Sequence, residues 1–180
     1  YLPGSMVLET TWHTPTGWMI VRDALVMAPW TGGSRSTTRM RPPGDFTARG
    51  ALVRTATCIE GQVDVFLNCM PLFDYGRTVG TWEYASDGYD VETCTNGDDG
   101  LTVRLGGTFP LGLTGARASA RAELHKGQTG FIVLSWTDVA IDTVEQAVEN
   151  VEVTIAYWRD WLQRAEIPDH AWRPYLERSA

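Results

Sequence analysis

The stretch GALVRTATCIEGQVDVFLNCM, residues 50–70, decides the fold class. Its second half places Val63, Val65, Leu67 and Cys69 at every second position. A period of two is typical of a strand whose sheet has one buried face. Glu60-Gly61 separates this run from the equally β-rich residues before it, and the glycine accepts a positive φ. We therefore predict a hairpin of strands Gly50–Ile59 and Gln62–Met70.

The rest of the first 136 residues repeats this pattern of short strands and turns. Met6–Trp12 and Trp18–Met27 flank the Pro- and Gly-containing turn 14–17, which predicts another hairpin. Residues 30–45 are predicted to be a loop, because Gly32-Gly33 and Pro42-Pro43-Gly44 interrupt any regular secondary structure. The remaining predicted strands are Thr81–Ala85, Tyr89–Thr95, Leu101–Leu105, Phe109–Leu113, Ala116–Leu124 and Gly130–Trp136. About nine or ten strands without an intervening helix favour a mainly-β, antiparallel sandwich.

The periodicity changes at Asp142. The sequence Asp142-Thr-Val-Glu145 resembles a capping box, with the aspartate as the predicted N-cap. Apolar residues then recur at steps of three and four, which predicts an amphipathic helix as far as Arg164, stopped by Pro168. They are Val144, Ala147, Val148, Val151, Ile155, Trp158, Trp161 and Leu162. We expect Trp158 and Trp161 to pack between this helix and the sheet or another domain.

These patterns predict three parts: a β-sandwich domain over residues 1–141, a linker helix over 142–167, and the start of a further helical domain over 168–180. The chain begins without Met and stops inside a predicted second helix. We therefore expect it to be a piece of a longer protein whose helical domain follows downstream.

Composition excludes several kinds of partner. Twenty-two acidic residues against 15 Lys and Arg give a net charge of −7, which repels nucleic acid. No apolar run approaches the ~20 residues that cross a bilayer, so no membrane partner is expected. Cys58, Cys69 and Cys94 show no metal-ligand spacing, and the three histidines are isolated, so we expect no metal or cofactor. Unpaired cysteines favour a reduced, cytoplasmic location.

One acidic stretch has residues suited to sugar chemistry. Asp74 and Glu83 lie among Tyr75, Arg77 and Trp82, and glycosidases need only two carboxyl groups at the right separation. The plainer interpretation is a salt-bridged loop, in which Arg77 pairs with one of the acids and the aromatic residues pack at an interface. Salt-bridged loops are far commoner than catalytic pairs, so we favour the plainer one and keep all five residues as candidates for binding a substrate or an interface.

The chain contains eight tryptophans, whose flat faces suit sugar rings and protein interfaces alike. Trp18 and Trp136 fall within strand patterns and are predicted to be core residues. Trp12, Trp30 and Trp82 lie near strand ends or loops and are predicted to be freer to bind a ligand.

Several motifs, in their order along the chain, resemble the N-terminal region of bacterial glycoside hydrolase family 15 proteins, the glucoamylase-like and trehalase-like enzymes. They are Tyr1-Leu-Pro-Gly4, Val7-Leu-Glu-Thr-Thr-Trp12, Phe73-Asp-Tyr-Gly-Arg77, Trp82-Glu-Tyr84, Ser135-Trp136, Trp158-Arg-Asp-Trp-Leu162, His170-Ala-Trp-Arg173 and Arg178-Ser-Ala180. The resemblance implies an antiparallel β-supersandwich truncated at its N-terminus, a long C-terminal linker helix, and the first residues of a helical toroid.

The resemblance also implies a chemistry. Members of the family hydrolyse α-glucosidic bonds with inversion, using a glutamic acid and a second carboxylate that both lie in the toroid. No position of this chain matches those motifs, so no catalytic residue is expected here. The sequence thus predicts a non-catalytic domain of an enzyme for trehalose or maltooligosaccharides, partnered by a C-terminal helical catalytic domain. Two alternatives stay open: a stand-alone carbohydrate-binding β-sandwich module, and an interaction domain that uses the Trp-rich helix.

Overall fold

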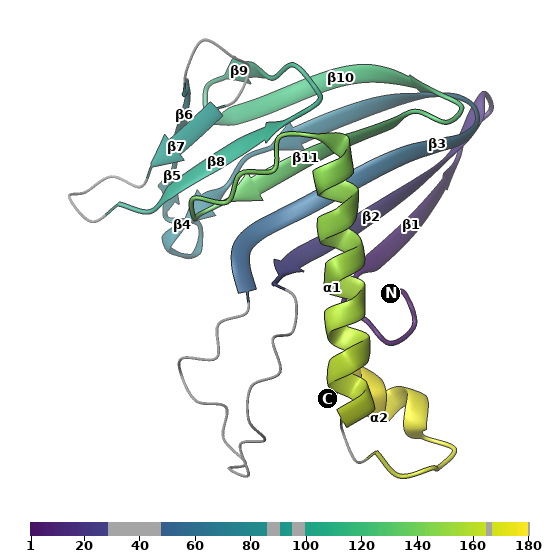
Figure 1. Ribbon diagram of the computed structural model, residues 1–180. Helices are drawn as coiled ribbons and strands as arrows, with labels where there is room; N and C mark the ends of the chain where they lie inside the picture. Colours follow the sequence, from purple (N-terminus) through teal and green to yellow (C-terminus); the bar gives the residue numbers. More distant parts are fainter. Residues whose placement is uncertain (29–47, 86–90, 95–99, 165–166, 180) are drawn as a thin grey trace.

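The computed structural model describes residues 1–28, 48–85, 91–94, 100–164 and 167–179 (Figure 1). The predicted loop at 30–45, together with Trp30, lies outside these residues. Strands dominate the described part. They are β1 (Leu8–His13), β2 (Gly17–Met27), β3 (Ala48–Cys69), β4 (Leu72–Phe73), β5 (Thr78–Val79), β6 (Thr81–Tyr84), β7 (Val91–Cys94), β8 (Thr102–Gly107), β9 (Gly112–Thr114), β10 (Arg117–His125) and β11 (Thr129–Ser135). Two helices follow, α1 (Val144–Arg164) and α2 (Arg173–Ser179).

Every strand pair in the described residues is antiparallel. The main layer has the order β1-β2-β3-β11-β8-β7-β6, and β10 pairs with both β3 and β9. The predicted hairpin before residue 27 is confirmed, with Leu8 opposite Asp23 and His13 opposite Trp18. The predicted mainly-β, antiparallel class is therefore confirmed, whereas the supersandwich implied by the resemblance stays a prediction.

The predicted hairpin at Glu60-Gly61 is wrong. β3 runs through these residues without a break, and its two halves pair with different strands. The first half pairs with β2 and β11, and the second half, from Gln62, pairs with β10. The chain does fold over at Gly61, which has φ +68, but the two halves lie in different layers and do not pair with each other. The fold is tight, because a Cβ on Gly61 would overlap the carbonyl oxygen of Thr16.

β10 and β11 follow β3 around the same corner. Their register to β3 continues across the turn, with His125 opposite Gln62 and Thr129 opposite Thr57. Backbone bonds hold the corner together: Lys126 N donates to Gly61 O at 2.9 Å and Gly127 N donates to Cys58 O at 2.8 Å. The result is a second, smaller layer of β9, β10 and the second half of β3, folded over the main sheet (Figure 1).

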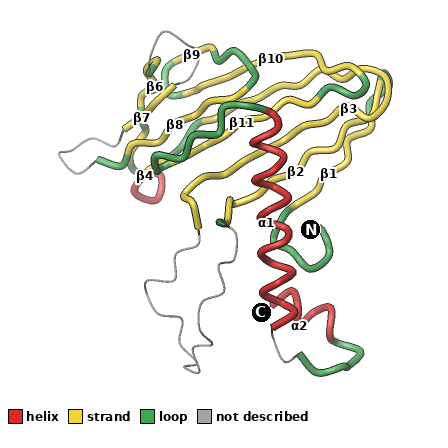
Figure 2. Tube along the Cα trace, in the orientation of Figure 1, coloured by secondary structure: helices red, strands yellow, loops and turns green. Residues whose placement is uncertain are grey.

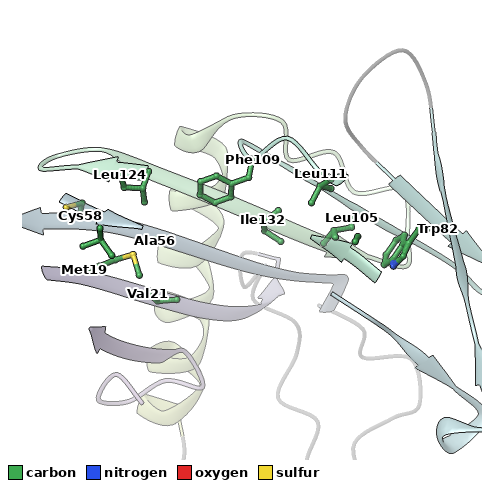
Figure 3. Packing of buried hydrophobic residues seen from close by; sticks show 12 residues of the cluster. Met19, Val21, Ala56, Cys58, Trp82, Leu105, Phe109, Leu111, Leu124 and Ile132 are labelled. Carbon is green, nitrogen blue, oxygen red and sulfur yellow. The ribbon is translucent and has the colours of Figure 1, made fainter. Parts of the chain in front are cut away.

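The core between these two layers includes Val63, Val65 and Leu67 from the alternating run that the sequence singled out. Met19, Val21, Ala56 and Ile132 point from the main layer toward the second layer (Figure 3). The second layer meets them with a set of small and branched side chains: Val63, Val65, Leu67, Ala118, Ala120, Ala122 and Leu124. The period of two along the second half of β3 therefore has the predicted cause, one buried face.

α1 covers the opposite face of the main layer (Figure 2). Ala147, Val151 and Ile155 pack on Val53 and Phe131, and all five are almost completely buried. Thr154 fixes the helix to the sheet, because its hydroxyl accepts from Met27 N at 3.1 Å and donates to Asn150 O at 2.7 Å. The predicted apolar stripe is confirmed at these positions, although Val148 is exposed and Tyr157, which the stripe omitted, is buried.

The N-terminus of α1 is capped one residue later than predicted. Gln146 N donates to Thr143 Oγ1 at 3.2 Å, and the Gln146 side chain accepts from Asp142 N and Thr143 N. This reciprocal pair is a Thr-x-x-Gln capping box, so the N-cap is Thr143 rather than Asp142. Neither α1 nor α2 is long and apolar enough to span a membrane.

Candidate functional site

The acidic loop predicted as a candidate site is a tight turn between β4 and β5. Asp74–Gly76 forms one turn of 3₁₀ helix, and Asp74 and Tyr75 both have positive φ, at 47° and 53°. Non-glycine residues are uncommon in this conformation. Arg77 N donates to Asp74 O at 3.1 Å, and the Arg77 guanidinium lies 3.8 Å from the Asp74 carboxylate. The turn therefore projects Asp74, Tyr75 and Arg77 into solvent, which matches the salt-bridged loop.

Trp82 and Glu83 are consecutive residues of β6, so the pleat of the strand points their side chains to opposite faces. Trp82 is 4% exposed and lies near Leu105 in the core between the layers, so its indole face is not open to a ligand (Figure 3). Its Nε1 is buried without a hydrogen-bond partner among the described residues. Glu83 points outward. The expectation that a position near loops leaves Trp82 free is therefore wrong.

The exposed tryptophans are in other places. Trp12 is 54% exposed, as predicted, whereas Trp18 and Trp136 are 40% and 41% exposed rather than core residues. Trp18 stacks on His13, with ring centroids 4.8 Å apart. Both mispredicted residues lie at strand ends, where the strand pattern continues but neither the second layer nor α1 covers the sheet.

A cleft of about 280 Å³ opens between the two layers, beside β1 and β2. Its main-layer wall includes Trp12, Met19 and Val21, and its other wall is the second half of β3. The ion pair of Arg54 and Asp23 lies in its lining, with Arg54 Nε 2.6 Å from the carboxylate. Asp64 also lines the cleft, and its carboxylate lies 3.4 Å from Arg121 of β10. The lining comes from strands that are far apart in the sequence. The sequence reasoning missed this cleft for that reason.

A second groove, of about 400 Å³, lies at the end of α1. Trp158 and Trp161 form one wall, with ring centroids 6.2 Å apart in an edge-to-face arrangement. The N-terminal segment Tyr1–Met6 and two residues of α2, Pro174 and Glu177, complete the lining. The structure thus brings the two tryptophans predicted for interdomain packing into one apolar groove.

The described residues hold no group of three or more His, Cys, Asp or Glu side chains that could bind a metal ion. Cys58 is buried and Cys69 is partly buried, and both are free thiols. Burial raises the pKa of the Cys69 thiol above its ordinary value. A raised pKa keeps a thiol protonated near neutral pH, which is the opposite of what a nucleophilic cysteine needs.

Comparison with known proteins identifies the relatives of this chain. Over 185 aligned positions it is 44% identical to the trehalase of Mycolicibacterium smegmatis and 43% identical to the trehalase of Mycobacterium tuberculosis, and both matches cover the whole chain. Over its whole length the chain is thus similar to part of the trehalase-like glycoside hydrolases. The recognition of an N-terminal domain of such a glycoside hydrolase, made from the sequence motifs, is confirmed. This trehalase-like chain spans 28% and 27% of the length of the two relatives.

The trehalase-like chain also has a structural relative. It superimposes on a human-microbiome protein assigned as a kojibiose phosphorylase with a TM-score of 0.54 and 10% identity, over 96% of this chain and 26% of the other. At that identity the likeness concerns the fold alone. No family model matches the sequence.

Proposed function

We propose that this chain is a non-catalytic domain of a glycoside hydrolase whose full-length form hydrolyses α-glucosidic bonds with inversion, with trehalose as its preferred substrate. One observation carries the proposal: the whole chain matches two enzymes named trehalase yet spans little more than a quarter of either. Most of such an enzyme, including room for a separate catalytic domain, then lies outside these 180 residues.

The carboxylates of the cleft and of the candidate loop support placing catalysis elsewhere. An inverting glycosidase needs two carboxyl groups about 6.5–9.5 Å apart, one of them able to donate a proton to the leaving group. The cleft between the layers has two carboxylates in its lining, Asp23 and Asp64, but each is already engaged by an arginine. In the candidate loop, Asp74 lies beside Arg77 in open solvent.

We place the candidate loop at the rim of the catalytic domain's active-site cleft. The turn at Asp74–Gly76 holds two non-glycine residues at positive φ and exposes Tyr75 completely. Strained backbone persists where the surrounding structure or a function maintains it. Tyr75 and Arg77 would contact sugar hydroxyls or fix the domain interface. The groove containing Trp158 and Trp161 would receive the adjoining helical domain.

The test of the proposed function is an activity assay of the longer protein and of residues 1–180. We expect the longer protein to hydrolyse trehalose faster than maltooligosaccharides, and NMR of the first product to show inverted anomeric configuration at the cleaved bond. Residues 1–180 alone are expected to be inactive. Hydrolysis by residues 1–180, or retention of configuration by the longer protein, would contradict the proposal.

The loop has its own test, the Arg77→Ala variant of the longer protein. We expect turnover of trehalose to fall by about tenfold, the cost of one lost hydrogen bond to substrate, or the melting temperature to drop if the loop locks the interface. Arg117→Ala, which removes an exposed arginine of β10, is the matched control and should change neither quantity. An Arg77→Ala protein with unchanged turnover and melting temperature would refute the role of the loop.

A second candidate, a carbohydrate-binding module, is favoured by the exposed rings of Trp12, Trp18 and Trp136 on the sheet. Aromatic faces of this kind bind sugar rings through their apolar C–H surfaces. Titration of residues 1–180 with trehalose and with maltooligosaccharides, followed by tryptophan fluorescence, tests it. Saturable quenching in the millimolar range or tighter would favour the module, and a flat response would favour the non-catalytic domain.

A further inference from the structure

A pocket of about 280 Å³ lies beside the N-terminal half of α1, on the face of the main sheet that this helix crosses (Figure 2). Its floor is formed by β2, β3 and β11, and its wall includes Val148 and Val151 of α1. The alternation of β3 separates it from the cleft between the layers. Thr55 and Thr57 line the pocket, whereas Ala56 lines the cleft on the other side of the sheet.

Three threonine hydroxyls lie on the floor of this site, which we call the hydroxyl pocket. Thr55 and Thr57 are alternate residues of β3, and Thr129 lies opposite Thr57 on β11. The hydroxyls of Thr57 and Thr129 hydrogen-bond to each other at 2.9 Å. That bond uses one of the two hydroxyl protons, so the pair keeps a donor as well as acceptor lone pairs for a ligand.

Thr55 is the residue of the hydroxyl pocket that the fold leaves unsatisfied. It is 5% exposed, and its hydroxyl makes no hydrogen bond with any of the described residues. Its neighbours on the same face of the sheet include Val53 and Phe131, which offer no polar side-chain atom. Buried polar groups are normally satisfied by protein, by ordered water or by a ligand. The place left for a partner of Thr55 is the pocket that it lines.

The charged residues at the pocket form one network. Arg22 Nε donates to Glu9 at 2.8 Å, and Arg22 Nη1 donates to Glu152 at 3.1 Å. A guanidinium has five N–H groups and a carboxylate about four lone pairs, so Arg22 and Glu152 keep donors and acceptors for a ligand. One cation between two carboxylates leaves a net charge of −1, which disfavours phosphate and other anions.

The lining therefore combines hydroxyls, one charge network and the apolar side chains of Ile20, Ile59, Val148 and Val151. A sugar ring matches this combination, because each of its hydroxyls both donates and accepts and its C–H face is apolar. An ammonium group only donates, and a phosphate dianion only accepts. The volume of about 280 Å³ is at the small end of the range for ligand pockets, which suits one ring rather than a long chain.

We infer that the hydroxyl pocket binds a neutral sugar in its pyranose form, with Thr55, Arg22 and Glu152 as hydrogen-bonding residues. A ligand of about 12 non-hydrogen atoms has little binding energy available, so the expected Kd is about 1–10 mM. The site contains no tryptophan. It depends neither on the substrate proposed above nor on the loop at Asp74–Gly76.

Protection of an introduced thiol tests the inference in the longer protein. Val148 lines the pocket and is 39% exposed, whereas Glu149 is exposed on the same turn of α1 outside the lining. Peptide mapping by mass spectrometry reads the alkylation of V148C and of E149C separately from the native cysteines. A hexose at ten times its Kd should slow alkylation of V148C about tenfold and leave that of E149C unchanged.

The probes are D-glucose, D-galactose and D-mannose at up to about 100 mM, with glycerol at the same concentration as the control. At least one hexose should protect V148C, and glycerol should not. Protection by none of the hexoses, or equal protection by glycerol, would overturn the inference. A folded V148C protein whose thiol does not react even without sugar would also overturn it, because the pocket would then be covered by another part of the protein.

Thr55→Val assigns the protection to this pocket. Because the hydroxyl has no partner within the described fold, valine should leave the urea unfolding midpoint unchanged, yet it should raise the Kd read from V148C about tenfold. Thr114→Val, which removes an exposed hydroxyl of β9, is the matched control and should change neither quantity. An unchanged Kd in the folded T55V protein would overturn the inference. The V148C result decides it alone if T55V fails to fold.

Discussion

The two faces of the main sheet are built to different degrees of completion. On one face, α1 covers Val53, Phe131 and Val133, and the core there has almost no exposed surface. On the other face, the second layer covers β11 and β8 but stops short of β1 and β2, where a cleft opens. The difference teaches that, within the described residues, one face of the sheet has a complete cover and the other has only a partial one.

The largest expected effect is on the helix-covered face. Phe131→Ala should lower the free energy of unfolding by about 3–5 kcal/mol, because it removes a fully buried aromatic side chain and leaves a cavity. Phe66→Ala is the matched control at the edge of the cleft, where the ring is 66% exposed, and should cost less than about 1 kcal/mol. Urea unfolding measures both. Similar losses would mean that the two faces are equally closed.

The corner that joins the two layers comes next. Gly61→Ala should lower the free energy of unfolding by about 2–4 kcal/mol. The alanine would be held at a positive φ, and its Cβ would clash with Thr16 O. Gly115→Ala isolates the backbone strain, because Gly115 has φ +58 and nothing within 4 Å of a new Cβ, and should cost about 1 kcal/mol. If the two variants were equally stable in urea, the corner would be looser than the contacts indicate.

The hydrogen bond between α1 and β2 gives a smaller effect. Thr154→Val should lower the free energy of unfolding by about 1–3 kcal/mol, because it leaves the buried Met27 N–H without an acceptor. Hydrogen exchange at Met27 should accelerate as well. Thr154→Ser keeps the hydroxyl and should leave the Met27 amide protected. Rapid exchange at Met27 in both variants would show that the hydroxyl does not hold it.

The smallest effect concerns pH, on the side of the core between the layers. Burial raises the pKa of the Cys69 thiol in the folded protein. The group therefore contributes its full stability below the unfolded pKa and loses it as pH rises through the folded pKa. Cys69→Ala should make the free energy of unfolding decline less steeply than in the unsubstituted protein at alkaline pH, with no difference between them in slope near pH 6. Parallel curves throughout would contradict a buried thiol.

Strands and helix were predictable from the sequence because their signals are local. The period of two along Val63–Cys69 and the three- and four-residue steps from Ala147 to Ile155 each report a buried face, and a side chain's face depends only on the backbone repeat. The capping box was placed one residue early because Asp142 and Thr143 are both good N-caps. Only the geometry of Gln146 distinguishes them.

Pairing partners and depth of burial were not predictable, because they depend on distant residues. An alternating run, a glycine and a second alternating run describe a hairpin and a strand that folds into a second layer equally well. The partners that decide between them, β10 and β11, begin only at Arg117 and Thr129, far beyond the end of β3 at Cys69. In the same way, the alternation along a strand does not show that Trp82 packs near Leu105, or that neither the second layer nor α1 covers Trp18. The candidate loop could be found from the sequence because its residues are neighbours in the chain, whereas the cleft could not, because its lining residues come from distant strands.

The docking of α1 on β2 also sets the time at which this domain can finish folding. Arg22 and Glu152, and likewise Met27 and Thr154, are joined across 130 and 127 residues of chain. Contacts at such separation close large loops and slow folding, while β1 and β2 can pair as soon as both are made. During synthesis, the apolar residues of β2 and β3 that face α1 have no cover until Ile155 emerges from the ribosome. The surface that becomes the core under α1 is therefore exposed during synthesis, and a chaperone that assists the domain would act there.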